Sequence, residues 1–290
     1  MKEFYYPSSN GIDNVESIIW ECEKPRFALQ IVHGMQEHIG RYADFAKFLN
    51  AHNVLVAGEN HLGHGKTSKT LGDFGDGDTI SHVIKDVHYL NEHLSKTYNV
   101  PVYILGHSMG SFITRYYIYK YKTEKAVIMG TGNTPAFLAN LLYALASIDE
   151  KIFGKEHRSE FLSALTTGSF VKSADGGNWI SYNLENAEHY KKEPLCGFKF
   201  YPSGFKFLGR ILSLIQREDT FKNANVDKIL LISGKDDVVG AHHGVEKVFN
   251  RYLKYLPNVE MKLFEDMRHE ILNEKENQKV YEYVLKFLEN

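Results

Sequence analysis

The five residues 106–110, GHSMG, constrain the fold of this chain more than any other feature of its sequence. They follow an apolar run at 102–105 and precede a segment of helical character at 111–122. A G-x-S-x-G between a strand and a helix is typical of a nucleophile elbow, a turn so sharp that its central residue is strained. The flanking glycines avoid a steric clash there, so we expect the hydroxyl of Ser108 to lie exposed at the top of a sheet. The alternative is a glycine-flanked turn with an incidental serine.

Strand-like and helix-like segments alternate on both sides of this motif. Helical spacing of apolar residues marks 41–52, 79–98, about 241–253 and a last helix at the end of the chain. A hairpin of residues 4–6 and 18–20 is expected before them. Continuous apolar strands that alternate with helices predict an α/β fold with a mostly parallel central sheet flanked by helices. The predicted buried strands are residues 28–32, 54–58, 102–105, 126–129, 229–233 and 260–264.

The alternation stops at about residue 131 and resumes near residue 227. We therefore expect a core domain of residues 1–130 and 227–290, interrupted by a helical cap of residues 131–226, because structureless loops of that size are rare. The most apolar part of the insertion, residues 136–148, is too short to span a bilayer. We expect this segment either to line an apolar channel or touch a membrane surface transiently, or to be a buried helix packed on the core.

The charge balance argues against one class of partner. With 34 basic and 36 acidic residues, a formal net charge of -2 and no long basic run, the chain is not expected to bind nucleic acid. Its two cysteines, Cys22 and Cys196, exclude a disulfide framework. The first residues lack the apolar stretch of a signal peptide, and no apolar run is long enough for a transmembrane helix, so a cytoplasmic location is expected. The sequence does not indicate an oligomeric state.

A serine needs a general base to become nucleophilic near neutral pH, and histidine suits that task. In proteins with this kind of elbow the serine comes first, then an acid, then the histidine, each after a strand of the sheet. Of the 14 histidines, His269 follows the last predicted strand and precedes the last helix. The acid is expected after the preceding strand, where Asp237 is favoured and Asp236 is the alternative. Its role would be to fix one tautomer of the imidazole and to stabilise the imidazolium.

An acyl-transfer site also needs donors for the negative charge that develops on the carbonyl oxygen. The backbone amide of Met109, directly after the serine, is one expected donor, and the amide of Met35, in the loop after an earlier strand, is the other. No metal site is predicted, because His61 and His64 have no further ligand at suitable spacing. No cofactor is predicted, because the sequence has neither a G-x-G-x-x-G after the first strand nor a P-loop.

Several segments resemble the monoacylglycerol lipase and lysophospholipase branch of the α/β-hydrolases, within the S33-like Hydrolase_4 family. In chain order they are HGMQEHIGRY, NHLGHGKTS, ILGHSMGSFITR, LISGKDDVVG and MRHEILNE, and EPLCGF at 193–198 resembles the cap of bacterial members. The resemblance implies an α/β-hydrolase fold with a cap, Ser108 as nucleophile, His269 as base and the amides of Met35 and Met109 as oxyanion hole. The family spacing GxxD, counted from Gly234, selects Asp237 as the acid.

Two positions depart from the family pattern. Asn60 stands where an aspartate is usual, which puts a contact that holds the loop in doubt, and Ser111 stands where a second glycine is common. Neither departure removes an expected catalytic residue.

The resemblance implies a serine carboxylic-ester hydrolase that cleaves single-chain lipid esters, a monoacylglycerol or a lysophospholipid, through an acyl-enzyme. A peptidase or amidase of the same fold would use the same triad, and so would a cofactor-free haloperoxidase or perhydrolase. A non-catalytic binding protein on this fold is disfavoured, because such proteins typically lack a triad member and all three are present here.

Overall fold

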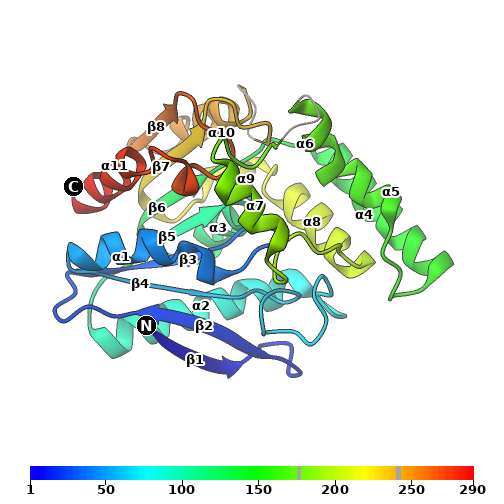
Figure 1. The fold of residues 1–290 in the computed structure, drawn as a ribbon, viewed down its shortest axis with the longest axis horizontal. Helices are drawn as coiled ribbons and strands as arrows, with labels where there is room; N and C mark the ends of the chain where they lie inside the picture. Colours follow the sequence, from blue (N-terminus) through cyan, green and yellow to red (C-terminus); the bar gives the residue numbers. More distant parts are fainter. Residues whose placement is uncertain (175–177, 240–242) are drawn as a thin grey trace.

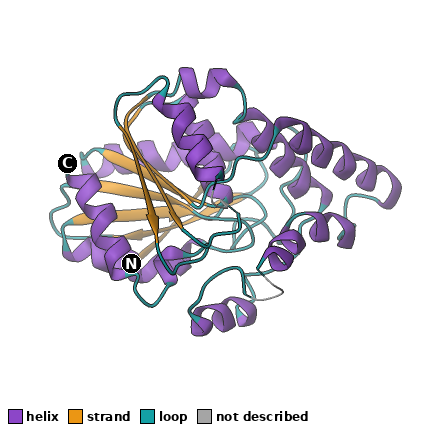
Figure 2. Ribbon diagram, turned by 90° about the horizontal axis from the view of Figure 1, so that it is seen from above, coloured by secondary structure: helices purple, strands orange, loops and turns teal. Residues whose placement is uncertain are grey.

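The computed structural model of the chain describes residues 1–174, 178–239 and 243–290. An eight-stranded sheet in the order β1-β2-β4-β3-β5-β6-β7-β8 lies at its centre (Figures 1 and 2). From β4 to β8 in that order all strands are parallel, whereas β2 is antiparallel to β1 and to β4. The opening hairpin and the mostly parallel sheet are therefore confirmed. The strands are β1 (Lys2–Pro7), β2 (Asn14–Trp20), β3 (Phe27–Val32), β4 (Val54–Glu59), β5 (Val102–His107), β6 (Thr123–Met129), β7 (Val226–Gly234) and β8 (Val259–Phe264).

Successive residues of a strand point to opposite sides of the sheet, so an entirely apolar strand presents apolar side chains on both faces. Helices cover both of these faces. On β3, Leu29 and Ile31 pack with α1 and α11 in one core, whereas Val32 packs with α2, α3 and α10 in another. The predicted helix at 41–52 begins as a 3-10 turn, and the predicted start near residue 241 lies outside the described residues. These helices are η1 (Ile39–Tyr42), α1 (Ala43–Ala51), α2 (Thr79–Tyr98), α3 (Met109–Lys120), α10 (Gly244–Leu253), η2 (Ile271–Asn273) and α11 (Gln278–Glu289).

The inserted segment between β6 and β7 is helical. In Figure 1, α4, α5 and α6 lie at one side of the sheet, and α8 lies between them and α3. Gly209 of α8 permits close packing on α4, because a Cβ there would lie 2.8 Å from the carbonyl oxygen of Ala139. The helices are α4 (Ala136–Phe153), α5 (Glu160–Leu165), α6 (Thr167–Ser173), α7 (Leu184–Lys192), α8 (Pro202–Leu214) and α9 (Glu218–Lys222).

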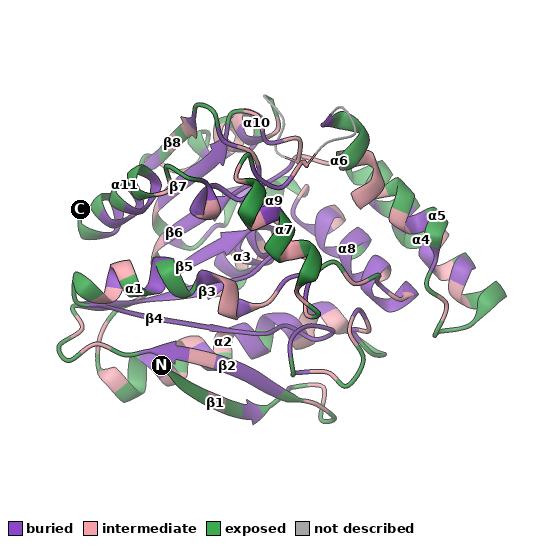
Figure 3. Ribbon diagram, viewed as in Figure 1, coloured by how far each residue is buried: buried purple, intermediate pink, exposed green. Residues whose placement is uncertain are grey.

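The apolar segment at 136–148 forms most of α4, which is amphipathic only in part. Ala139, Leu142 and Ala146 are buried, but Phe137 and Ile148 are 69% and 53% exposed, and Figure 3 shows exposed stretches along α4. The interpretation of this segment as a buried helix is therefore wrong for its outer face. Within the described part of the chain, none of the helices combines the length and the apolar character needed to cross a membrane.

Candidate active site

Ser108 lies at a sharp turn between β5 and α3, with φ 53° and ψ -120°. This is a region of φ and ψ that residues with side chains rarely adopt. The glycines on either side are required by packing: a Cβ on Gly110 would lie 1.9 Å from the carbonyl oxygen of Val32, and one on Gly106 would lie 2.2 Å from Thr114 Oγ1. The start of α3 therefore packs directly against the end of β3. The strained elbow predicted from the sequence is confirmed.

His269 follows β8, and its Nδ1 lies 2.9 Å from both carboxylate oxygens of Asp237, which follows β7. Asp237 also accepts hydrogen bonds from Ser233 Oγ at 2.7 Å and from the amide of Val239 at 2.8 Å. Burial alone would raise the pKa of Asp237, but the charge and hydrogen bond of His269 and the two further hydrogen bonds lower it below its ordinary value. Asp236 instead accepts a hydrogen bond from a tyrosine at the surface. The structure thus pairs Asp237, and not its neighbour, with the imidazole.

The opposite edge of the His269 ring carries Nε2. This nitrogen is buried and has no hydrogen-bond partner among the residues that the structure describes. Ser108 and His269 both line a narrow cavity of about 20 Å³. A neutral imidazole with an acid on Nδ1 and an unpaired Nε2 can take a proton from a hydroxyl placed next to it.

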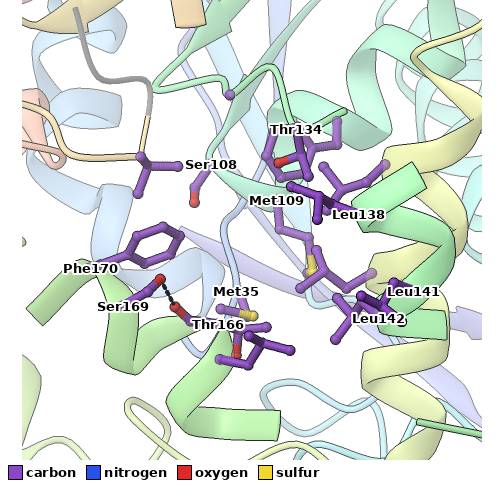
Figure 4. Close-up of a pocket in the computed structure, with 16 residues that line it drawn as sticks. Met35, Ser108, Met109, Thr134, Leu138, Leu141, Leu142, Thr166, Ser169 and Phe170 are labelled. Atoms are coloured by element: carbon purple, nitrogen blue, oxygen red, sulfur yellow. Dashed lines mark hydrogen bonds between the residues drawn. The ribbon is translucent and has the colours of Figure 1, made fainter. Parts of the chain in front are cut away.

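The two predicted oxyanion donors belong to different elements that meet beside Ser108. Met109 is the first residue of α3, and the first N–H groups of a helix have no acceptor within that helix. Met35 lies in the turn after β3, and it lines a larger cavity together with Ser108 and Met109 (Figure 4). Gly34 allows this turn to approach, because a Cβ there would lie 3.1 Å from the Cβ of Ser108.

The larger cavity has a volume of about 270 Å³ and is mostly apolar. The hydroxyl of Ser108 points into it, with the leucines of α4 on one side and Phe170 on the other (Figure 4). A cavity of this kind accommodates a hydrocarbon chain and offers little to a charged group. Its apolar lining comes from Met35, Met109, Phe112, Leu138, Leu141, Leu142, Leu165, Phe170, Leu208, Leu212 and Val239.

A buried carboxylate to which the sequence analysis assigned no role, Glu37, connects the turn after β3 to the elbow. Its Oε1 accepts hydrogen bonds from the amide of Gly34 at 2.6 Å and from His107 Nδ1 at 3.0 Å, and His107 Nε2 donates to the carbonyl of His269 at 3.3 Å. Burial would raise the pKa of Glu37, but His107 and the charge of Arg41 hold it well below its usual range. Burial would lower the pKa of His107, but Glu37 raises it. The pair is therefore ionic, and it links three loops of the site.

Arg41 extends this cluster to the loop after β8. Its guanidinium donates to Glu37 Oε2 at 3.0 Å and makes two bonds to Glu270, at 2.5 and 2.7 Å. It also donates to Asn186 Oδ1 of α7 at 3.0 Å, which joins the inserted helices to the core. The segments that carry the family resemblance contain Glu37, Arg41 and His107. Their place in these segments was the one sequence signal that could have pointed to a role in the site. The sequence does not reveal how these residues pair.

The histidines that were set aside as metal ligands instead hold the Met35 turn. His64 Nε2 accepts from the amide of Gln36 at 3.2 Å, and His61 Nε2 donates to the carbonyl of His33 at 3.3 Å. Among the described residues there is no group of three or more histidine, cysteine, aspartate or glutamate side chains that could hold a metal ion.

The contact placed in doubt by Asn60 is present. Its Oδ1 accepts from the amide of Ile39 at 2.9 Å, and its Nδ2 donates to Glu16 Oε2 at 2.7 Å. An amide suits this position because the neighbouring side chain is itself a buried carboxylate.

Comparisons with known proteins agree with this geometry. The family model described as Hydrolase_4 (serine aminopeptidase, S33) matches residues 23–276. A monoacylglycerol lipase of Mycolicibacterium smegmatis is 27% identical over 300 residues, which cover 99% of this chain and 96% of the relative. A thermostable carboxyl esterase from Bacillus coagulans, solved in complex with glycerol, is 27% identical and covers 99% of this chain and 97% of its own, with a TM-score of 0.90. A lipase solved in an open form is 26% identical, covers 98% and 96%, and gives a TM-score of 0.87.

Proposed function

The chain belongs to the Hydrolase_4 family of α/β-hydrolases and is a serine ester hydrolase, and we propose that its substrates are single-chain lipid esters, either monoacylglycerols or lysophospholipids. The observation that carries this proposal is the apolar cavity of about 270 Å³ that Ser108 lines. A fatty-acyl chain needs an apolar wall along its length, which the leucines of α4 and α8 supply. A peptide would need partners for its charged and amide groups, and the described lining of this cavity contains no charged side chain.

In the proposed reaction, Ser108 Oγ attacks the ester carbonyl carbon and its proton passes to His269 Nε2. The amides of Met35 and Met109 donate to the carbonyl oxygen as it becomes an oxyanion, and Asp237 stabilises the imidazolium. When the intermediate collapses, His269 gives the proton to the departing alcohol and the acyl group stays on the serine. Water then attacks the acyl-enzyme with His269 as base, and the fatty acid leaves.

The two cavities suggest where each half of the substrate lies. The acyl chain occupies the larger, apolar cavity, and the alcohol leaves through the narrow cavity that His269 lines. The similar esterase of Bacillus coagulans was solved with glycerol. Glycerol is the alcohol that hydrolysis of a monoacylglycerol would release here, which supports a glycerol ester as substrate.

We assign residues 131–226 the role of a cap, because α4, α5, α6 and α8 supply most of the apolar wall around the acyl chain. The cap also exposes apolar side chains on α4 and α5, including Phe137, Ile152, Phe153 and Phe161, each more than 60% exposed. Exposed apolar groups of this density mark a surface that meets lipid or protein. Leu141 both belongs to this surface and lines the cavity, so we propose that the cap rests transiently on a membrane and takes its substrate from it.

We place this activity in the cytoplasm, where Cys22 and Cys196, both free thiols in the structure, stay reduced.

The test is a panel of substrates assayed with the wild type and with Ser108→Ala. It contains p-nitrophenyl esters of increasing chain length, a monoacylglycerol, lysophosphatidylcholine and matched p-nitroanilides. We expect the wild type to prefer long-chain esters and to leave anilides almost uncleaved, and Ser108→Ala to lose about 10⁴-fold or more in kcat. Labelling by a fluorophosphonate should require Ser108. Equal, slow hydrolysis of every compound by both proteins would contradict the proposal, and faster cleavage of anilides would favour an amidase.

A further inference from the structure

Residues 178–183 of the insertion, which we call the strap, lie on the loop that carries His269. The amide of Glu270 donates to the carbonyl of Ile180 at 2.8 Å, and the guanidinium of Arg268 donates to the carbonyl of Asn178. Both sequence neighbours of His269 are therefore bound to the insertion.

A single buried carboxylate fastens the strap. Glu274, only 4% exposed, accepts hydrogen bonds from Ser181 Oγ at 2.8 Å and from the amides of Tyr182 and Asn183, each at 3.0 Å. It also accepts from the amide of Arg268 at 2.9 Å, next to the histidine. Hydrogen bonds to an ionised acceptor are stronger than neutral ones, so this arrangement fixes the strap and the loop as one unit.

The strap places the indole of Trp179 against the imidazole of His269. The ring centroids are 5.2 Å apart with an interplanar angle of 39°, and Phe170 of α6 packs on the same indole at 5.2 Å. Trp179 also lines the narrow cavity that contains Ser108. Asp237 holds the Nδ1 edge of the imidazole, and the ring of His107 packs on it with centroids 4.7 Å apart, so the contact with Trp179 is the restraint that the insertion adds.

We propose that the strap is a positioning element for the general base: Glu274 and Ser181 hold it in place, and Trp179 keeps the His269 ring oriented toward Ser108. This inference rests on the proposed function. An indole face also excludes water and attracts the imidazolium that forms during each proton transfer. The insertion then has a second role, because it completes the catalytic geometry as well as covering the substrate.

The test compares Trp179→Ala, Trp179→Phe and Ser181→Ala with the wild type on p-nitrophenyl acetate, a dissolved ester that does not depend on the acyl cavity. The control is Ser147→Ala, whose hydroxyl bonds to the backbone of its own helix, α4. We expect kcat to fall about 10²-fold in Trp179→Ala, because small misplacements of a catalytic group are costly, with little change in KM. Trp179→Phe should restore much of the rate, and Ser147→Ala should match the wild type.

Two further measurements separate positioning from simple loss of stability. Thermal unfolding of each variant shows that the assay temperature lies below its transition. The proton NMR resonance of the Nδ1–H of His269, assigned by its loss in Asp237→Asn, should move in Trp179→Ala and in Ser181→Ala. In a double-mutant cycle, Ser181→Ala should add little to Trp179→Ala if both act through the strap.

Lower melting temperatures with unchanged kcat and an unmoved resonance would show that the strap only stabilises the fold. That result is distinct from failure of the proposed function, in which the wild type itself hydrolyses no ester and takes up no fluorophosphonate.

Discussion

The strain at Ser108 is a property of single residues and their immediate neighbours. The positive φ persists because the start of α3 is pressed against β3, so that Gly110 has no room for a side chain. Such steric requirements act between residues close in sequence or in adjacent strands. This is the reason that a five-residue motif was enough to predict the turn.

At position 60, the neighbouring carboxylate of Glu16 favours an amide side chain over a carboxylate. Its amide donates to Glu16 at 2.7 Å in a buried setting, so Asn60→Asp would place two carboxylates side by side. We expect this change to lower the free energy of unfolding by about 2 kcal/mol, and Asn60→Asp combined with Glu16→Gln to recover part of the loss. Urea denaturation of the three proteins measures both effects. Equal stability of wild type and Asn60→Asp would mean that the Glu16 contact contributes nothing.

Glu59 at the end of β4 is fully buried, and burial raises its pKa from 4.5 to about 7 despite a hydrogen bond from Gln30. Between these two values the folded protein keeps a proton that the unfolded chain releases. Stability contributed by this group is therefore present below pH 4.5 and is lost as the pH rises through about 7. The carboxylate lies 3.4 Å from His61, one of the histidines that support the Met35 turn.

We therefore expect Glu59→Gln, which copies the protonated form, to gain stability relative to the wild type as the pH rises. From about pH 5.5 to about pH 8, the difference in free energy of unfolding should grow by about 2 kcal/mol. Urea denaturation at several pH values measures this difference. The buried histidines are common to both proteins, so their pH-dependent contributions to the free energy of unfolding cancel in it. A difference that stays constant with pH would contradict the raised pKa.

At the scale of elements, Arg41 joins the first turn of the α1 region to the loop after β8 and to α7. Its partners Glu37 and Glu270 are both buried. Burial would raise the pKa of Glu270, but the charge and hydrogen bond of Arg41 help to keep that pKa below its ordinary value. Removing one partner from a buried charge cluster leaves uncompensated charge, whereas replacing the whole cluster need not be destabilising.

Arg41→Met is accordingly expected to cost about 3–5 kcal/mol in the free energy of unfolding. Arg41→Lys should recover less than half of that loss, because an ammonium cannot make the paired contact with Glu270. Differential scanning calorimetry of the two variants and the wild type measures this order of stability. If Arg41→Lys were as stable as the wild type, the paired hydrogen bonds between Arg41 and Glu270 would contribute nothing to stability.

At the scale of the whole molecule, α4 has two apolar faces with different uses. Leu142 on its inner side lines the cavity, and Ile152 and Phe153 on its outer side are exposed. An apolar face exposed to water is unfavourable, and the proposed contact with a membrane would bury it.

We expect Ile152→Ser combined with Phe153→Ser to reduce binding to phosphatidylcholine vesicles about 30-fold, because about 2 kcal/mol of apolar burial in the membrane is lost. Co-sedimentation with vesicles measures binding, and turnover of a monoacylglycerol embedded in them should fall in parallel. The control is Ile12→Ser, an equally simple change at a residue that is 87% exposed and lies in the turn between β1 and β2. Unchanged vesicle binding of the double variant would exclude this surface as the membrane contact.

Much of the core could be read from the sequence because its signals are local. Short, mostly apolar runs of four or five residues predicted the strands β3 to β8, and helical spacing predicted α2 with the correct bounds, Thr79–Tyr98. The insertion was harder, because its short helices bury little apolar surface and α4 is apolar on both sides. Periodicity alone cannot tell which of two apolar faces is covered.

By itself, the sequence determined the order of strands and helices, the sharp turn at Ser108 and the loops on which an acid and a histidine follow it. Each of these depends on residues that are neighbours in the chain. Only the tertiary structure decided how Arg41 links Glu37 to Glu270 and that Trp179 lies on the imidazole. Those contacts join segments up to 229 positions apart, and distances between such segments are set by packing of the whole molecule.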